Sequence, residues 1–181
     1  MNRDFSAQKP GQKWVSAITC IRTGEGGLYL TAILDLADTK VVGWALSDRL
    51  KAADTRIAAW QMALKNRPLD GALLFPSERG VQYACIEFGD QFKELPVLQS
   101  MRGLPEQSKG NGWDNAVAES FLKTLKCAMV NDVHFETRHQ AKLARFEYIE
   151  GWYNRRGKPS TLDYQAPLQG ESYFFTSSVA A

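Results

Sequence analysis

Three closely spaced, mainly hydrophobic runs lie near the start of the chain. The runs are rich in β-branched residues and are separated by short polar or glycine-containing turns, a pattern that predicts an antiparallel meander. A short apolar run later in the chain predicts a fourth strand, and another predicts a fifth. The expected strands are "WVSAITCI", "LYLTAILDL", "KVVGWALSD", "GALLF" and "PVLQSM".

Helical spacing appears between and after these strands. "TRIAAWQMALKNR" ends in basic residues before Pro68, which is typical of a helix end. Further helices are expected over residues 83–94, 113–130 and 137–155, and the last should bury one apolar face. The residues expected on that face are Leu143, Phe146, Ile149, Trp152 and Tyr153. This order of elements predicts an α/β fold in which helices flank a mixed sheet.

The composition is that of an ordinary globular chain. Its 181 residues are 44% hydrophobic and 23% charged, enough for one domain with a sizeable core. We expect an extended leader over residues 1–13 and a tail over residues 159–181. The formal net charge is only +2, so evidence for a nucleic-acid partner must come from where the charges lie.

The cysteines and histidines form no recognisable metal or disulfide pattern. Cys20, Cys85 and Cys127 are widely separated, which fits a reducing cytosol. His134 and His139 lack the spacing of a metal motif. Neither an apolar leader nor a run of about 18 apolar residues occurs, so we expect a soluble protein without membrane contact.

The segment "KGNGWDNAVAESFLKTLK" joins a glycine turn, with Gly110 and Gly112, to a helix. Asp114 lies where the turn is expected to become helix, and it suits either an N-cap or a chemical role. Glu119, Lys123 and Lys126 project from one side of this helix, and an apolar flank lies opposite. The flank consists of Val117, Phe121, Leu122 and Leu125.

Two interpretations of the charged side remain open. Glutamate and lysine at this spacing commonly form a solvated face with salt bridges. Alternatively, the carboxylate holds a Mg²⁺ ion while the lysines neutralise nearby phosphates, which suits work on a nucleic-acid backbone.

Five ordered blocks of the chain resemble the catalytic core of insertion-sequence transposases of the retroviral-integrase type, the group called insertion sequence three. The resemblance covers roughly residues 3–168, and the blocks are "KWVSAIT", "LYLTAILDLADTKVVGWALSDR", "LLFPSERGVQY", "KGNGWDNAVAESFLKTLK" and "FEYIEGWYNRRGKPSTLDYQAP". The resemblance implies a ribonuclease-H-like fold with a five-stranded mixed sheet flanked by helices, and an integrase-like core over residues 14–158. It also implies three carboxylates that hold two Mg²⁺ ions, with Mn²⁺ as a substitute, for DNA cleavage and strand transfer.

The chain departs from this family pattern at two of the three carboxylates. The first aspartate falls on Ala17, the second on Glu78, with Pro76 where a histidine is usual, and the third carboxylate on Glu119. A methyl group cannot ligate a metal, and a longer side chain misplaces a ligand that Mg²⁺ needs in near-ideal geometry. We therefore expect weakened metal binding and a degenerate active site. A short insertion at "RGLPEQS" lengthens the loop before the glycine turn at little entropic cost.

Several other residues have two interpretations. Asp35, or Asp38 beside it, either replaces the missing carboxylate or makes local turn bonds. Arg155 and Arg156, like Lys158, either contact phosphate or stabilise a helix end. Arg79 either meets phosphate or pairs with Glu78. Among the tryptophans, which mostly suit packing, Trp113 is a candidate for DNA contact.

Two functions from different classes follow. The first is a transposase or integrase core for DNA integration, catalytically degenerate. The second is a non-enzymatic DNA-binding or oligomerisation module that shares complexes with an intact transposase. A nuclease of the same fold would show metal-dependent hydrolysis without strand transfer. The expected partners are DNA and further copies of the chain or an intact transposase, in the bacterial cytoplasm near the nucleoid.

Overall fold

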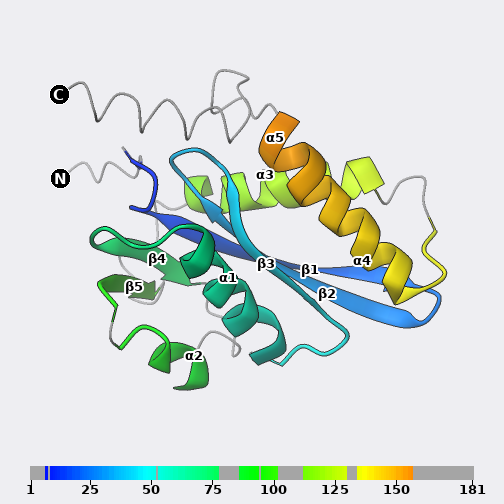
Figure 1. Cartoon of the computed structure of the whole chain (residues 1–181), viewed down its shortest axis with the longest axis horizontal. Helices are drawn as coiled ribbons and strands as arrows, with labels where there is room; N and C mark the ends of the chain where they lie inside the picture. Colours follow the sequence, from blue (N-terminus) through cyan, green and yellow to red (C-terminus); the bar gives the residue numbers. More distant parts are fainter. Residues whose placement is uncertain are drawn as a thin grey trace.

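The computed structural model of the chain describes residues 7, 9–51, 53–77, 86–93, 95–101, 112–129 and 134–156. Within this part, strands and helices follow one another in the predicted order (Figure 1). The strands are β1 (Trp14–Thr23), β2 (Gly26–Asp35), β3 (Val41–Ser47), β4 (Leu73–Ser77) and β5 (Val97–Met101). The helical segments are η1 (Ala53–Ile57), α1 (Ala58–Asn66), α2 (Ile86–Asp90), α3 (Gly112–Met129), α4 (Arg138–Phe146), η2 (Glu147–Tyr153) and α5 (Asn154–Arg156).

The first three strands form the predicted antiparallel meander. β1 pairs with β2 along its whole length, from Trp14 opposite Asp35 to Thr23 opposite Gly26, and β2 pairs in turn with β3. Gly26 has φ +112°, a backbone conformation that side chains rarely allow, and it follows the tight turn between β1 and β2. The local sequence of the strands and of the turn between them therefore accounts for the meander.

The other two strands form a separate parallel pair. β4 and β5 pair from Leu73 opposite Val97 onward, and a single bridge between Lys13 and Leu74 connects β4 to the residue before β1. Among the described residues the five expected strands are thus present, but they form a three-stranded and a two-stranded sheet rather than one continuous sheet. Because only that bridge joins the two sheets, the alignment of β4 with β1 depends on contacts other than the hydrogen bonds between paired strands.

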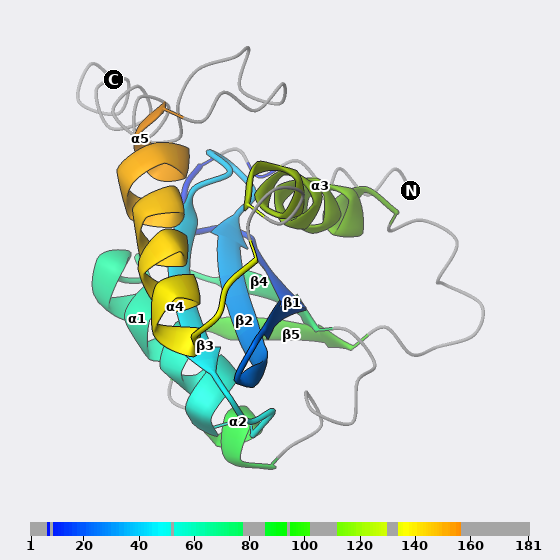
Figure 2. The ribbon, with the colours of Figure 1, turned by 90° about the vertical axis from the view of Figure 1, so that its right-hand side faces the viewer.

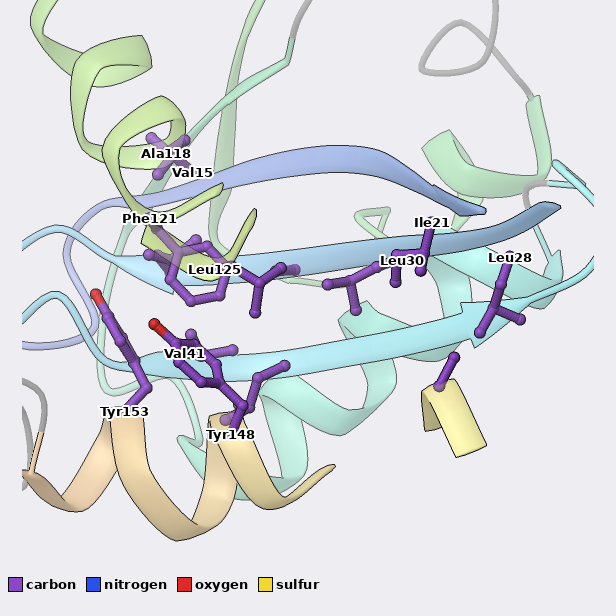
Figure 3. Close-up of a cluster of buried hydrophobic side chains, with 14 of the residues drawn as sticks. Val15, Ile21, Leu28, Leu30, Val41, Ala118, Phe121, Leu125, Tyr148 and Tyr153 are labelled. Carbon is purple, nitrogen blue, oxygen red and sulfur yellow. The ribbon is translucent and has the colours of Figure 1, made fainter. Parts of the chain in front are cut away.

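Two hydrophobic cores lie on the opposite faces of the meander, because successive strand residues point to opposite sides. One core packs against α3, α4 and η2 (Figures 2 and 3), and the other packs against α1 and α2. Fully buried members of the first core include Leu28, Leu30, Ala32, Leu34, Leu125 and Ile149. In the second, Trp60 makes edge contacts with the rings of Trp14, Phe75, Phe88 and Phe92.

The last helical region runs unbroken from Arg138 to Arg156, but its buried face differs from the prediction. Ile149 and Tyr153 are buried as expected, whereas Leu143 and Phe146 are each 54% exposed and Trp152 is 44% exposed. The structure instead buries Ala141, Arg145, Tyr148 and Asn154. In the middle, η2 has π-helical hydrogen bonding, from i to i+5, which changes the face that the helix presents to the sheet.

Arg145 is the unexpected member of that buried face. Its guanidinium lies over the ring of Phe135, 5.7 Å from the ring centroid, and burial lowers the pKa of Arg145 to about 10. The helix predicted over residues 83–94 ends earlier than expected, at Asp90. Its described part contains a five-residue helix, α2, followed by turns.

Candidate active site where α3 crosses β1

Position 17 lies in the middle of β1, on the face of the sheet that α3 covers. Ala17 is half-buried, lies opposite Ala32 of β2 and packs against the same core as Val15 and Ile21. Figure 3 shows Val15 beside Ala118 where α3 crosses β1. A side chain at position 17 therefore projects toward the layer formed by α3.

The helix α3 has the two faces that its sequence predicts. Phe121 and Leu125 are buried in the core, and Val117 and Leu122 are partly buried. Glu119, Lys123 and Lys126 are exposed. Because Glu119 directly follows Ala118, which is buried against the β1 side of the core, the structure brings the helix that carries Glu119 next to the strand that carries Ala17.

The fourth strand approaches the same region from the other side of β1. The amide of Leu74 donates to the carbonyl of Gln12 at 2.8 Å, and β4 runs parallel to β1 beyond this point. β4 ends at Ser77, three residues after Leu74. The equivalent step along β1, three residues after Lys13, leads to Ser16, which is next to Ala17. Glu78 and Arg79 follow Ser77 and lie outside the described residues.

On this face the described residues supply one of the three carboxylates that a centre with two metal ions requires. Ala17 offers only a methyl group, and Glu119 is the one carboxylate that the described residues place at the predicted site. More broadly, the described residues contain no group of three His, Cys, Asp or Glu side chains able to hold a metal ion. His134 and His139 are both exposed.

Asp35 has the structural role that its sequence position allowed, not that of a replacement ligand. Its carboxylate accepts hydrogen bonds from the Gly11 amide at 2.6 Å, the Trp14 indole at 2.8 Å and the Ala37 amide at 3.0 Å. It also accepts from Arg67 Nη1 at 2.6 Å, and its side chain is fully buried. The bond to Ala37 is the expected local turn bond.

Asp38 shares the same arginine. Arg67 Nη2 donates to Asp38 Oδ2 at 2.6 Å, and the Lys40 amide donates to Asp38 Oδ1 at 3.1 Å. Burial raises the pKa of Asp38, although Arg67 opposes this shift. Burial alone would lower the pKa of Arg67, but the hydrogen bonds and charges of Asp38 and Asp35 outweigh it and raise that pKa.

Sequence reasoning missed Arg67 as the partner of both aspartates. It interpreted the arginine only as a basic residue at a helix end, and nothing in the local pattern indicates a contact with residues about 30 positions away. The arginine ends α1 just before the chain turns into β4, so this network ties the start of β1, the end of β2 and the approach to β4 together.

The helix that carries Arg155 and Arg156 begins directly after a residue that contacts α3. The rings of Phe121 and Tyr153 are in edge contact, with centroids 4.8 Å apart, and α5 begins one residue after Tyr153. Asn154 anchors α5 to β3 by bonds to the backbone of Val41 at 3.0 and 3.1 Å. Arg155 and Arg156 are exposed at the end of this helix.

The glycine turn differs from the prediction in one respect. α3 begins at Gly112, so Gly112 belongs to the helix, and Asp114, the expected cap, falls in its first turn, two residues after the helix begins. The side chains of Trp113 and Asp114 lie outside the described side chains, as does Gly110 as a whole. A negative charge in a first turn remains favourable because of the helix dipole.

The fold and the arrangement of α3 on β1 define the integrase-core class of ribonuclease-H-like proteins. The chain matches the integrase core domain family over residues 7–103, a second integrase core model matches residues 119–172, and the chain belongs to this family. It is similar to the catalytic core of human T-lymphotropic virus type 2 integrase solved with magnesium, with a TM-score of 0.59 and 15% identity. That alignment covers 90% of this chain and 97% of the viral one, and at this identity it supports the fold alone.

Its relatives among characterised proteins include bacterial transposases. The transposase for insertion sequence element IS904 of Lactococcus lactis is 38% identical over 96% of this chain, and transposase InsF for insertion sequence IS3A of Escherichia coli is 36% identical over 95%. The chain is thus a homologue of transposases of the insertion sequence three group. It spans 66% and 58% of the lengths of these relatives.

None of the helices in the described part of the chain combines the length and apolar composition that crossing a membrane requires.

Proposed function

We propose that the chain is the core of a DNA transposase that retains DNA binding and has lost efficient cleavage and strand transfer. The single observation that carries this proposal is the alanine at position 17, on the β1 face next to the helix of Glu119. Family membership supports the DNA substrate, and the bacterial relatives support a place on bacterial chromosomal DNA.

The cofactor of the ancestral reaction is a divalent cation, Mg²⁺ with Mn²⁺ as a substitute. The viral integrase core solved with magnesium supports this choice. When bound, two such ions activate the attacking oxygen and stabilise the leaving one in phosphoryl transfer. Glu119 and Glu78 remain to bind metal here, and because Ala17 supplies no ligand, we propose that metal binding is weakened.

Restoring the missing carboxylates tests the loss of activity. Strand transfer on DNA with transposon-end sequences is measured with Mg²⁺ and with Mn²⁺ for the unmodified chain, Ala17→Asp, and Ala17→Asp with Glu78→Asp. We expect no transfer by the unmodified chain and measurable transfer by the double variant. Transfer by the unmodified chain refutes the degenerate site, and hydrolysis without transfer identifies a different nuclease. A folded but inactive double variant places the damage beyond these positions.

The retained function is DNA binding, and Lys123 and Lys126 carry it in part. Both are exposed on the face of α3 that also presents Glu119. Replacing both with alanine should weaken binding nearly equally on all sequences and reduce the slope of log K against log salt by up to about two units. Lys65→Ala is the matched control, because Lys65 is exposed on α1, which packs on the other core. If the slope of log K against log salt is unchanged, the two lysines form a solvated face and do not contact DNA.

Arg155 and Arg156 extend this proposed surface. They follow Tyr153, whose ring contacts α3. We therefore propose that α3 and α5 contact phosphates of the same DNA backbone. Arg79 remains a proposed phosphate contact beside Glu78. We also propose that the chain associates with further copies of itself or with an intact transposase. If binding persists without catalysis, the chain acts as a non-enzymatic DNA-binding or oligomerisation module.

A further inference from the structure

Arg145 is a fully buried cation without a counter-charge among the described residues. Its guanidinium nitrogens Nε, Nη1 and Nη2 are all buried, and none of them donates to an acceptor in the described part of the chain. Arg67 shows how a buried arginine is paired elsewhere in this protein, because it donates to the carboxylates of Asp35 and Asp38. The core under α4 thus contains a positive charge that no described carboxylate balances.

Burial does not remove this charge. It lowers the pKa of Arg145 to about 10, a value still above neutral pH, so the guanidinium remains protonated in the interior. The guanidinium lies over the ring of Phe135, 5.7 Å from the ring centroid, and the face of the ring attracts a cation without neutralising it. Because an unpaired buried charge is strongly unfavourable, this place in the core favours a negatively charged partner.

A second buried donor lies three residues further along the same helical region. Tyr148 is buried, and its hydroxyl has no hydrogen-bond partner in the part of the chain that the structure describes. Burial raises the pKa of Tyr148 to about 12, against the opposing charge of Arg145, so the phenol is a neutral donor at neutral pH. The buried side of this helical region therefore presents two donor groups and no acceptor, which is the arrangement that an anion requires.

We propose that Arg145, with Tyr148 beside it, binds a small monovalent anion of the chloride class inside the core under α4. One negative charge balances the guanidinium, whereas a dianion such as sulfate would leave a net charge in the interior. A halide is a single atom, which suits a closely packed core. DNA is not the ligand, because a fully buried guanidinium cannot reach a phosphate backbone, unlike the exposed Arg155 and Arg156.

The proposed site links the stability of the fold to the chloride concentration. A ligand that binds only the folded state lowers the unfolding equilibrium constant by the factor 1 + [L]/Kd, which is about tenfold for each tenfold rise in chloride above the Kd. General screening by salt does not distinguish between anions at equal ionic strength. A comparison of chloride with a bulky organic anion therefore isolates the binding.

Urea unfolding of the whole chain without DNA tests the site, with sodium gluconate replacing sodium chloride at constant ionic strength. The unmodified chain should become more stable as chloride replaces gluconate, and bromide should act like chloride. Arg145→Met should abolish this dependence and should be no less stable than the unmodified chain in gluconate, because it removes an unpaired charge and keeps an apolar side chain. Lys142→Met is the matched control, because it removes an exposed positive charge from the same helix.

A direct measurement and a milder variant complete the test. The chloride NMR line should broaden when the unmodified chain is added, and Arg145→Met should lose this broadening. Tyr148→Phe keeps the ring and should raise the chloride Kd about tenfold, since it removes one hydrogen bond to a charged acceptor. It also decides the matter if Arg145→Met does not fold.

Three results would overturn the proposal. The first is equal stability of the unmodified chain in chloride and gluconate. The second is a chloride dependence that persists in Arg145→Met or disappears in Lys142→Met. The third is an equal loss of stability by Arg145→Met in both salts, which would identify an acceptor within the protein. The inference is independent of the proposed DNA binding by Lys123 and Lys126, which would stand in any of these cases.

Discussion

Replacing Arg67 with methionine removes the cation from a buried network of two aspartates. Arg67 donates to Asp35 and to Asp38 at 2.6 Å each, and both aspartate side chains are fully buried. Methionine fills much of the space of the arginine stem but offers no donor. The substitution therefore leaves two carboxylates in the interior without their counter-charge, while the bonds to Asp35 from Gly11 and Trp14 remain.

The expected loss is large for a domain of this size. Breaking a buried ion pair by removing one partner costs about 3–5 kcal/mol. At about 2–4 °C per kcal/mol for domains of 150–250 residues, the melting temperature should fall by roughly 6–20 °C. Arg49→Met is the matched control because Arg49 is exposed, and surface substitutions usually stay within about 0.5 kcal/mol.

The loss should also depend on pH in a defined direction. The pKa of Asp38 in the folded protein already lies above its ordinary value of 3.8, because burial disfavours the charged form. Protonation of Asp38 thus favours the folded state, and its contribution to stability increases as pH falls from the folded pKa toward 3.8. Without Arg67, which lowers this pKa, the shift becomes larger, so the deficit of Arg67→Met should shrink at acidic pH.

Urea unfolding monitored by circular dichroism at about pH 5 and pH 8 measures both effects. We expect the difference in unfolding free energy between the variant and the unmodified chain to be smaller at the lower pH. A deficit below about 1 kcal/mol at pH 8 would mean that the ion pairs do not stabilise the fold as argued. A deficit that grows on acidification would refute the role assigned to Asp38.

Two further substitutions test the packing and the caps that hold the site in place. Gly43→Ala should destabilise by about 1–3 kcal/mol in a thermal melt, because an added Cβ would overlap the backbone of α1 and approach Ala63 N to 2.7 Å. Gly71→Ala, with no atom within 4 Å of the added Cβ, should cost little, and equal losses would refute the contact. Thr137→Ala should cost about 0.5–2 kcal/mol, because the Thr137 side chain caps α4 through the Gln140 amide at 3.2 Å. An unchanged melt would show that this cap contributes nothing.

Local patterns were sufficient for most of the secondary structure and for the two faces of α3. Successive residues of the meander pack into opposite cores, as with Ile33 in one and Leu34 in the other, because period-two spacing assigns residues to opposite faces without reference to the rest of the chain. Phe121 and Leu125 are buried and Glu119 is exposed for the equivalent reason in a helix. The exposed position of Glu119 on α3 could accordingly be predicted from the sequence.

The buried face of the last helix could not be decided in the same way. Its sequence offers an apolar stripe with Leu143 and Phe146, but the fold buries Ala141 and Arg145 instead. A small side chain permits close approach to the sheet, and a long arginine can bury its stem against an aromatic ring. The π-helical hydrogen bonds of η2 then change the helical period after Phe146, which a search for regular spacing does not anticipate.

The sequence by itself determined that position 17 has no metal ligand, because the donor atoms of a side chain do not depend on the fold. It also determined which residues could be charged on the exposed face of α3. Only the tertiary structure decided that Ala17 lies on the face that α3 covers, and that Asp35 and Asp38 are held by Arg67 instead of serving as replacement ligands. The physical reason is that these contacts join residues far apart in the chain, and burial and partner charges exist only once the chain has brought them together.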